Sequence, residues 1–160
     1  MDKTGNIKYN KATALYNEMM YLKGAHEWDN AVGMIQEWFY GSYVRASWCA
    51  TTVSYAANRA GLKIGKSENV YLLMTKCKLA TTGKFFTRDH LPETIKRGDI
   101  LFWLWSGTTM RTDSSKHVGV CTEDTPLKSA SIPCIGGNQS KSVCIKNYNT
   151  ARLYAVYRPE

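Results

Sequence analysis

The sequence predicts an α+β fold in which helices come first along the chain and strands follow. Apolar residues recur at helical spacing over much of residues 8–60, and short apolar runs bounded by Gly, Pro and polar residues follow from residue 100 onward. A chain of 160 residues is the size of one domain. We therefore expect a single domain over residues 1–160, with a helical part at 1–40 and a core at 41–160.

Helices are expected at residues 8–23, 31–40 and 48–60, and as a short helix or helical turn at 70–74. Gly24 follows the first helix, where glycine is favoured. Asp29 or Asn30 could cap the second. The third is the most regular, because Cys49, Val53, Ala56, Ala57 and Ala60 recur at helical spacing, and Gly61 follows it.

Strands are expected at residues 100–105, 117–122, 130–135, 143–146 and 153–157, with a polar loop at 106–115. The first of them is wholly apolar, as a central strand is. Together they predict an antiparallel sheet of about five strands packed on the helix that begins near Cys49.

The net charge of +8 and the pI of about 9.3 favour a polyanionic partner, which includes nucleic acid, an anionic membrane face and a carboxylate-rich cell wall. A basic surface that only aids solubility is the alternative. The 21 Lys and Arg form no run longer than two and accompany no nucleic-acid motif, so nucleic acid is not the expected partner.

No stretch approaches 18 apolar residues, and residues 1–6 contain no apolar segment typical of a signal peptide. We expect synthesis in the cytoplasm without a signal peptide, and no membrane insertion. Action on a cell wall, in the periplasm or outside the cell, would then require another route of export.

The five cysteines form no C-x-x-C pair, which argues against a zinc site and against a dense disulfide scaffold. Because the number is odd, at least one thiol stays unpaired within a monomer. Cys134 and Cys144 are symmetric about residue 139, so a hairpin centred there would place them opposite each other, where a disulfide could form. Five free thiols are the alternative.

Cys49 stands at the start of the third expected helix, where the helix dipole and free N–H groups lower a thiol pKa and could stabilise an oxyanion. Its base would be a histidine. Of His26, His90 and His117, the last opens an expected strand and could face the helix from a rigid position. A buried cysteine that only fills the core is the competing interpretation.

Five segments, in this order, resemble motifs of the CHAP-type amidohydrolase/peptidase family of phage-associated peptidoglycan hydrolases. They are Ser47-Trp48-Cys49-Ala50 through Ala60-Gly61-Leu62, Lys96-Arg97-Gly98-Asp99-Ile100-Leu101-Phe102, His117-Val118-Gly119-Val120, Ile135-Gly136-Gly137-Asn138-Gln139-Ser140 and Tyr157-Arg158-Pro159. Taken singly, Trp-Cys-Ala and Gly-Asp-Ile are weak signals. Together with Gly-Gly-Asn-Gln they are fairly specific.

The resemblance implies a papain-like fold and a cysteine hydrolase that cuts an amide bond of peptidoglycan, as an amidase or an endopeptidase. It implies a catalytic pair of Cys49 and His117, with Asn138 as the third member that orients the imidazole. Two features depart from the family. Gly136 stands where many members carry Glu, and residues 50–52 lack the aromatic that relatives place shortly after the cysteine.

Tyr43, Trp48 and Gln139 are candidates for the substrate groove or the oxyanion site, Tyr43 because a side chain six residues before the nucleophile takes that part in papain-like enzymes. Surface or core packing is the alternative for Tyr43. Trp103 and Trp105 could also shape the groove, and core packing is the alternative for all three tryptophans. The expected chemistry needs no metal or cofactor, and a monomer is expected.

Within the enzyme hypothesis, a phage endolysin, a virion-borne lysin and an antibacterial effector with a cognate immunity protein remain open. The competing class is a non-catalytic basic module that binds wall polymer or nucleic acid, in which Cys49 and His117 are structural.

Overall fold

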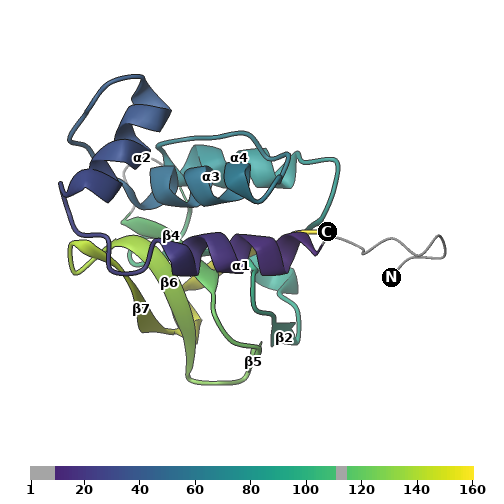
Figure 1. Ribbon diagram of the computed structural model, residues 1–160. Helices are drawn as coiled ribbons and strands as arrows, with labels where there is room; N and C mark the ends of the chain where they lie inside the picture. The colour runs from purple at the N-terminus through teal and green to yellow at the C-terminus, as the bar shows by residue number, and fades with distance from the viewer. Residues whose placement is uncertain (1–9, 111–114) are drawn as a thin grey trace.

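The computed structural model describes residues 10–110 and 115–160 and places helices against one face of an antiparallel sheet (Figure 1). The α-helices among these residues are α1 (Lys11–Tyr21), α2 (Asn30–Tyr40), α3 (Cys49–Arg59) and α4 (Val70–Lys78). The strands are β1 (Lys84–Phe86), β2 (Thr94–Ile95), β3 (Ile100–Leu104), β4 (Lys116–Cys121), β5 (Thr125–Pro126), β6 (Ser131–Gln139), β7 (Ser142–Asn149) and β8 (Leu153–Arg158). The predicted α+β class is confirmed.

Side-chain caps fix where the helices begin. The Asn10 side chain accepts from the Thr13 N–H at the start of α1, and residues 8–9 of the predicted helix lie outside the described ranges. Asp29, rather than Asn30, caps α2 by accepting from the Val32 N–H. Helix α4 runs to Lys78, well past the predicted end, because its buried residues recur at helical spacing along its whole length.

The main sheet has six strands in the order β1-β8-β3-β4-β6-β7, and β2 and β5 form a separate two-stranded sheet. The prediction of five strands missed β1. This edge strand of three residues pairs with β8, and it is too short to show an alternating pattern. Strands β6 and β7 both extend beyond their predicted ends, since they pair with each other from Ser131↔Asn149 to Gln139↔Ser142.

The central strands of the main sheet are buried on both faces. From β3, Ile100, Phe102 and Leu104 join the core under the helices. Leu101 and Trp103 point to the other face and join a second cluster. Double burial explains why this strand reads as a continuous apolar run in the sequence.

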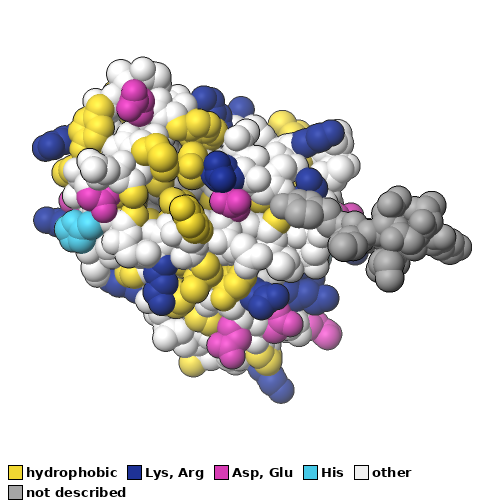
Figure 2. All heavy atoms as spheres, viewed as in Figure 1, with side chains coloured by type: hydrophobic (Ala, Val, Ile, Leu, Met, Phe, Trp, Pro, Cys, Tyr) yellow, Lys and Arg dark blue, Asp and Glu magenta, His cyan; other side chains and the backbone are white. Residues whose placement is uncertain are grey.

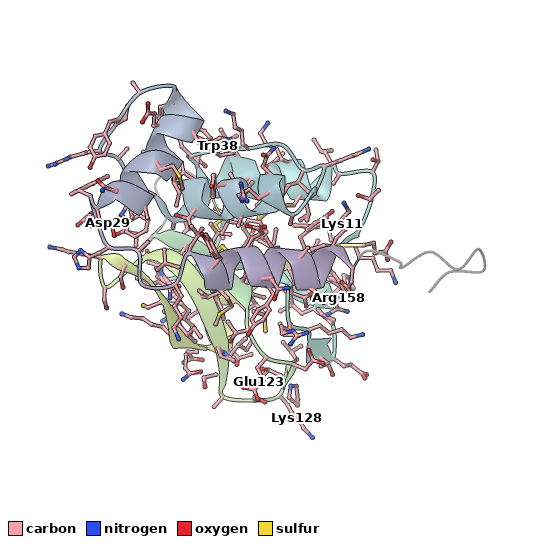
Figure 3. All side chains as sticks on the ribbon, in the orientation of Figure 1. Lys11, Asp29, Trp38, Glu123, Lys128 and Arg158 are labelled. Carbon is pink, nitrogen blue, oxygen red and sulfur yellow. The ribbon has the colours of Figure 1, made fainter. Side chains whose placement is uncertain are left out.

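A buried ion pair joins the start of β3 to the end of β8. The Asp99 carboxylate accepts from Nε of Arg158 at 2.9 Å and from its Nη2 at 2.8 Å, and also from the Lys96 N–H. Gly98, at φ +92°, brings its backbone against Ala12 of α1, where a Cβ atom would lie 2.3 Å from the carbonyl oxygen. Figure 3 shows Arg158 near Lys11, at the end of the molecule opposite Asp29. The Gly-Asp and Tyr-Arg-Pro segments therefore have a structural role.

Charge is dispersed on one face of the molecule (Figure 2). On the face drawn in Figure 2, Lys and Arg are scattered around apolar and acidic side chains and do not gather into one basic patch. Among the described residues, no helix combines the length and apolar character needed to cross a membrane.

Candidate active site

A buried glutamine positions the segment that leads into α3. Gln36 of α2 is fully buried, and its Nε2 donates to the carbonyls of Val44 at 3.0 Å and Ala46 at 3.3 Å. Its Oε1 accepts from the Thr51 hydroxyl at 2.7 Å, on the first turn of α3. Because one side chain joins the loop to the helix, the place of Cys49 between them is fixed.

Cys49 is the first residue of α3 and lies against β4, with 6% of its surface exposed. Burial raises the pKa of its thiol. Hydrogen bonds from the backbone N–H groups of Val118, Ala50 and Cys49 and from the Ser47 side chain oppose this rise. The sulfur therefore stands among donors that favour a negative charge, but it is a neutral thiol at rest.

His117 is the second residue of β4, and its ring is held by Gln139. Nε2 of the imidazole lies 2.9 Å from Oε1 of Gln139. The amide nitrogen of Gln139 in turn donates to the carbonyls of Cys134 at 3.2 Å and Cys144 at 2.7 Å. Since these two carbonyls fix which end of the amide is the acceptor, Nε2 of His117 must carry the proton. Nδ1 is then the nitrogen with a free lone pair.

Aromatic rings surround this imidazole. Trp105 stacks on it at 6.3 Å between centroids and 22° between planes, and Tyr148 meets it edge-on at 5.8 Å. Only 8% of His117 is exposed. Burial, and to a lesser extent the charge of Lys146, lowers the pKa of His117, while the hydrogen bond that its Nε2 donates to Gln139 opposes this change. The imidazole is therefore neutral at neutral pH, as a general base must be.

Tyr148 lies beside the candidate base. Its ring contacts His117, and burial followed by the nearby thiols of Cys134, Cys144 and Cys49 raises the pKa of its hydroxyl. In addition, the N–H group that reaches the Cys49 sulfur belongs to Val118, the residue after His117. The thiol therefore contacts β4 beside His117. The imidazole itself does not face α3 as expected: it packs with Trp105 and Tyr148 against the cluster on the other face of the sheet, and no hydrogen bond joins it to the sulfur in the described part of the chain.

Two adjacent glycines of β6 make room for both sides of the site. A Cβ atom on Gly136 would lie 2.5 Å from Oε1 of Gln139 and 3.0 Å from Nε2 of His117. A Cβ atom on Gly137 would lie 2.4 Å from Oγ1 of Thr52 and 2.9 Å from the Trp48 ring. The first glycine therefore accommodates the imidazole pair, and the second accommodates the first turn of α3.

Asn138 does not orient the imidazole. Its side chain is exposed, and its backbone takes φ +59° in an irregular part of β6 where the register with β7 shifts between Gly136 and Gln139. An extra residue in one strand changes which side chain points to a given face. Gln139 consequently occupies the position that the sequence had suggested for its neighbour.

The other groove candidates lie elsewhere. The Tyr43 hydroxyl donates to the Trp28 carbonyl at 3.3 Å, and its ring packs on Gly33 of α2. Its oxyanion role is therefore not supported. Trp48 is fully buried and belongs to the core, so it does not line a groove. Gln139 is 2% exposed and acts on His117 instead of facing a substrate.

All five cysteines are free, and Cys134 does not lie directly opposite Cys144, so the Cys134–Cys144 disulfide stays a prediction that the strand register does not favour. The β6–β7 turn lies at Ser140 and Lys141, both at positive φ, and not at residue 139. Together with the irregularity at Asn138, it pairs Cys144 with Gly136 and Cys134 with Lys146. The two thiols are diagonal neighbours and not directly opposed.

Sequence reasoning missed three residues of this site: Gln36, Ser47 and Tyr148. Gln36 had a detectable signal, since a glutamine beside Ile35 interrupts the apolar face of α2. Ser47 lies in the segment that resembles the family motif around the cysteine, but nothing there assigned it a role, and Tyr148 gave no signal because its position depends on how the strands meet. No group of three or more His, Cys, Asp or Glu side chains able to hold a metal occurs among residues 10–110 and 115–160.

Searches against family models, curated proteins and solved structures find no match for this chain.

Proposed function

We propose that this protein is a papain-like cysteine hydrolase that cuts an amide bond in the peptide part of peptidoglycan. Cys49 is the nucleophile, His117 the general base, and Gln139 the residue that orients the imidazole. The proposal draws its substrate from the resemblance to CHAP-type hydrolases and its chemistry from the site.

The observation that carries it is the fixed amide of Gln139. Two carbonyls fix the orientation of this amide, and its Oε1 accepts from Nε2 of His117, which sets the tautomer of the imidazole. Holding the proton on Nε2 leaves Nδ1 free to take a proton from a thiol, which is the task of a base beside a cysteine nucleophile. The lowered pKa of His117 keeps that nitrogen unprotonated at neutral pH.

The proposed reaction starts from a neutral Cys49 thiol and a neutral His117 imidazole. As the Cys49 sulfur attacks the amide carbonyl, its proton passes to His117, and the oxyanion meets the N–H groups at the start of α3 and the Ser47 hydroxyl. The imidazolium then protonates the leaving amine. A water molecule, activated by the same imidazole, releases the acyl group and restores the thiol.

The test is hydrolysis of purified sacculi by Cys49→Ala. We expect no muropeptide release, with native circular dichroism and an unchanged melting temperature to within a few degrees. Cys77→Ala is the matched control, because Cys77 is a buried helix cysteine on α4, and it should keep full activity. Full activity of Cys49→Ala would reject the proposal.

Mass spectrometry of the same digest assigns the bond. An amidase releases glycan strands free of peptide, whereas an endopeptidase leaves peptide on the sugar, either as shortened stems or as stems separated at the cross-bridge. The proposal includes action on the wall as a phage lysin or as a secreted effector; protection by a cognate immunity protein would favour the effector.

A basic binding module is the second candidate, favoured by the net charge of +8. It predicts binding to sacculi that weakens steeply with salt, resistance to thiol alkylation and no released product. Iodoacetamide treatment followed by a turbidity assay separates the two functions, because only the hydrolase loses its effect.

A further inference from the structure

The strand register places two cysteines directly opposite each other, and they are not the pair that sequence symmetry suggests. Cys121 of β4 pairs with Cys134 of β6. Residues that face each other across an antiparallel ladder project their side chains from the same face of the sheet. Both side chains are fully buried, in the cluster on the face away from the helices.

The local hydrogen bonding gives this pair the geometry that a disulfide needs. The N–H of Cys121 donates to the Asp99 carbonyl, and its carbonyl accepts from the Gly98 N–H, so both groups point away from β6. The adjacent cross-strand pair, Thr122 and Pro133, is hydrogen-bonded, because the Thr122 N–H donates to the Pro133 carbonyl. Cys121 and Cys134 therefore form a non-hydrogen-bonded pair, in which Cα atoms lie about 4.5 Å apart. That separation falls within the range that disulfides span.

The two sulfurs are turned away from each other in the reduced protein. The Cys121 thiol donates to the Glu123 carbonyl at 3.1 Å, further along the chain. The Cys134 sulfur lies over Gly119, where a Cβ atom would be 2.4 Å from it. Rotation about χ1 of each residue would bring the sulfurs together without a change in the pairing of β4 with β6.

We propose that Cys121 and Cys134 are the site of a cross-strand disulfide, formed by exchange with a small-molecule or protein disulfide in an oxidising compartment. The thiolate of one cysteine attacks a sulfur of the oxidant and releases one thiol, which leaves a mixed disulfide. The second cysteine attacks this bond as a thiolate, the Cys121–Cys134 bond forms, and a second thiol leaves. Two protein thiols are oxidised, and one disulfide is reduced to two thiols.

The accessibility of the pair sets when the bond forms. Burial raises the pKa of Cys121 to about 12 and raises that of Cys134 still further. Exchange on the folded chain is therefore slow, and the bond forms as the sheet assembles or opens. The bridge would join the strand that carries His117 to the strand that carries Gln139, but the inference does not depend on catalysis.

The experiment uses the full chain, denatured in reductant and refolded in a mixture of oxidised and reduced glutathione. Remaining thiols are blocked with N-ethylmaleimide under denaturing conditions and counted by intact mass. We expect three free thiols in place of five. The folded reduced protein, placed in the same mixture, should react much more slowly.

Tryptic mapping identifies the partners, because cleavage after Lys116, Lys128, Lys141 and Lys146 separates the three sheet cysteines. Cys121 lies on peptide 117–128, Cys134 on 129–141 and Cys144 on 142–146. A link between the first two peptides supports the proposal. A link between the last two, or five free thiols after refolding, overturns it.

Two variants complete the test. Cys144→Ser should form the same bridge, and Cys121→Ala should retain all of its remaining thiols. The bridged protein should melt roughly 5–10 °C higher than its reduced form, because the bond restricts the unfolded chain. Cys121→Ala should show no such difference between oxidising and reducing buffer.

Discussion

The imidazole of His117 and the side-chain amide of Gln139 hold each other in one orientation, with 2.9 Å between Nε2 and Oε1. The pair is buried under Trp105 and Tyr148, so water does not compete for the bond. The amide has no freedom to turn over, since both of its N–H groups are satisfied by carbonyls. This relationship makes the site testable through residues other than the nucleophile.

Gln139→Ala should lower kcat/KM by roughly 10- to 100-fold, which is less than the full contribution of a general base. The imidazole would remain but would lose its fixed tautomer. Unfolding in urea should show a loss of about 1–3 kcal/mol, since buried partners lose their hydrogen bonds. Asn138→Gly is the control, because Asn138 is exposed and glycine readily takes φ +59°. An equal loss in both variants would contradict the assignment.

Gln139→Glu should shift the acid limb of the pH–kcat/KM profile to higher pH. Burial lowers the pKa of His117 from its ordinary value of 6.5, so the wild-type limb should fall below that pH. A carboxylate beside Nε2 favours the imidazolium and raises the pKa of His117. The profile is measured with a soluble muropeptide. An unchanged limb would show that His117 does not control the reaction.

The same lowered pKa predicts how the stability of the fold depends on pH. Because the unfolded chain takes up the His117 proton first, folding stability should be fully present above pH 6.5 and should fall as the pH drops below it. In His117→Gln this contribution disappears. Urea midpoints of the two proteins, measured between pH 7.5 and pH 5, should therefore converge as the pH is lowered. Parallel curves would contradict the lowered pKa.

Gly136→Ala and Gly137→Ala should affect different parts of the site. The first methyl group would collide with the His117–Gln139 pair, and the second with Thr52 and the Trp48 ring. Each should cost about 1–3 kcal/mol, as overpacked core positions do. In folded protein, Gly136→Ala should shift the imidazole resonances of His117 in NMR spectra. Gly137→Ala should instead perturb the amides at the start of α3.

Gln36→Leu should weaken both the fold and the activity. The leucine fills the volume but leaves the Val44 and Ala46 carbonyls without their donor, and the Thr51 hydroxyl keeps only the Trp48 carbonyl as an acceptor. We expect a loss of about 1–3 kcal/mol and faster hydrogen exchange over the loop before α3. Glu37→Ala, at the exposed neighbouring position, is the control and should change neither.

Arg158→Ala should destabilise the protein by about 3 kcal/mol, because it leaves the buried Asp99 carboxyl without its partner. Arg59→Ala removes an ion pair with Glu18 that is largely exposed and should leave the urea midpoint almost unchanged. Activity per folded molecule should be the same in both variants. A selective loss of activity in Arg158→Ala would contradict a purely structural role.

Much of the architecture follows from local patterns. The spacing of apolar residues predicted α1, α2 and α3, and the run at Ile100 predicted a doubly buried strand. These elements can be predicted because the spacing of apolar side chains depends directly on which face of the element is buried. Strand β1 cannot be predicted in this way, because its three residues are too few to show a pattern and are extended through their pairing with β8.

The sequence by itself determined the helical spacing, the two-face burial of β3 and a thiol at the start of α3, since each depends on neighbours within a few positions. Only the tertiary structure decided that Gln139, and not Asn138, meets His117, and that Cys121, and not Cys144, faces Cys134. Both outcomes depend on the Ser140-Lys141 turn and the irregularity at Asn138. The insertion of a single residue into a strand exchanges its two faces, and no periodicity in the sequence reveals where that insertion falls.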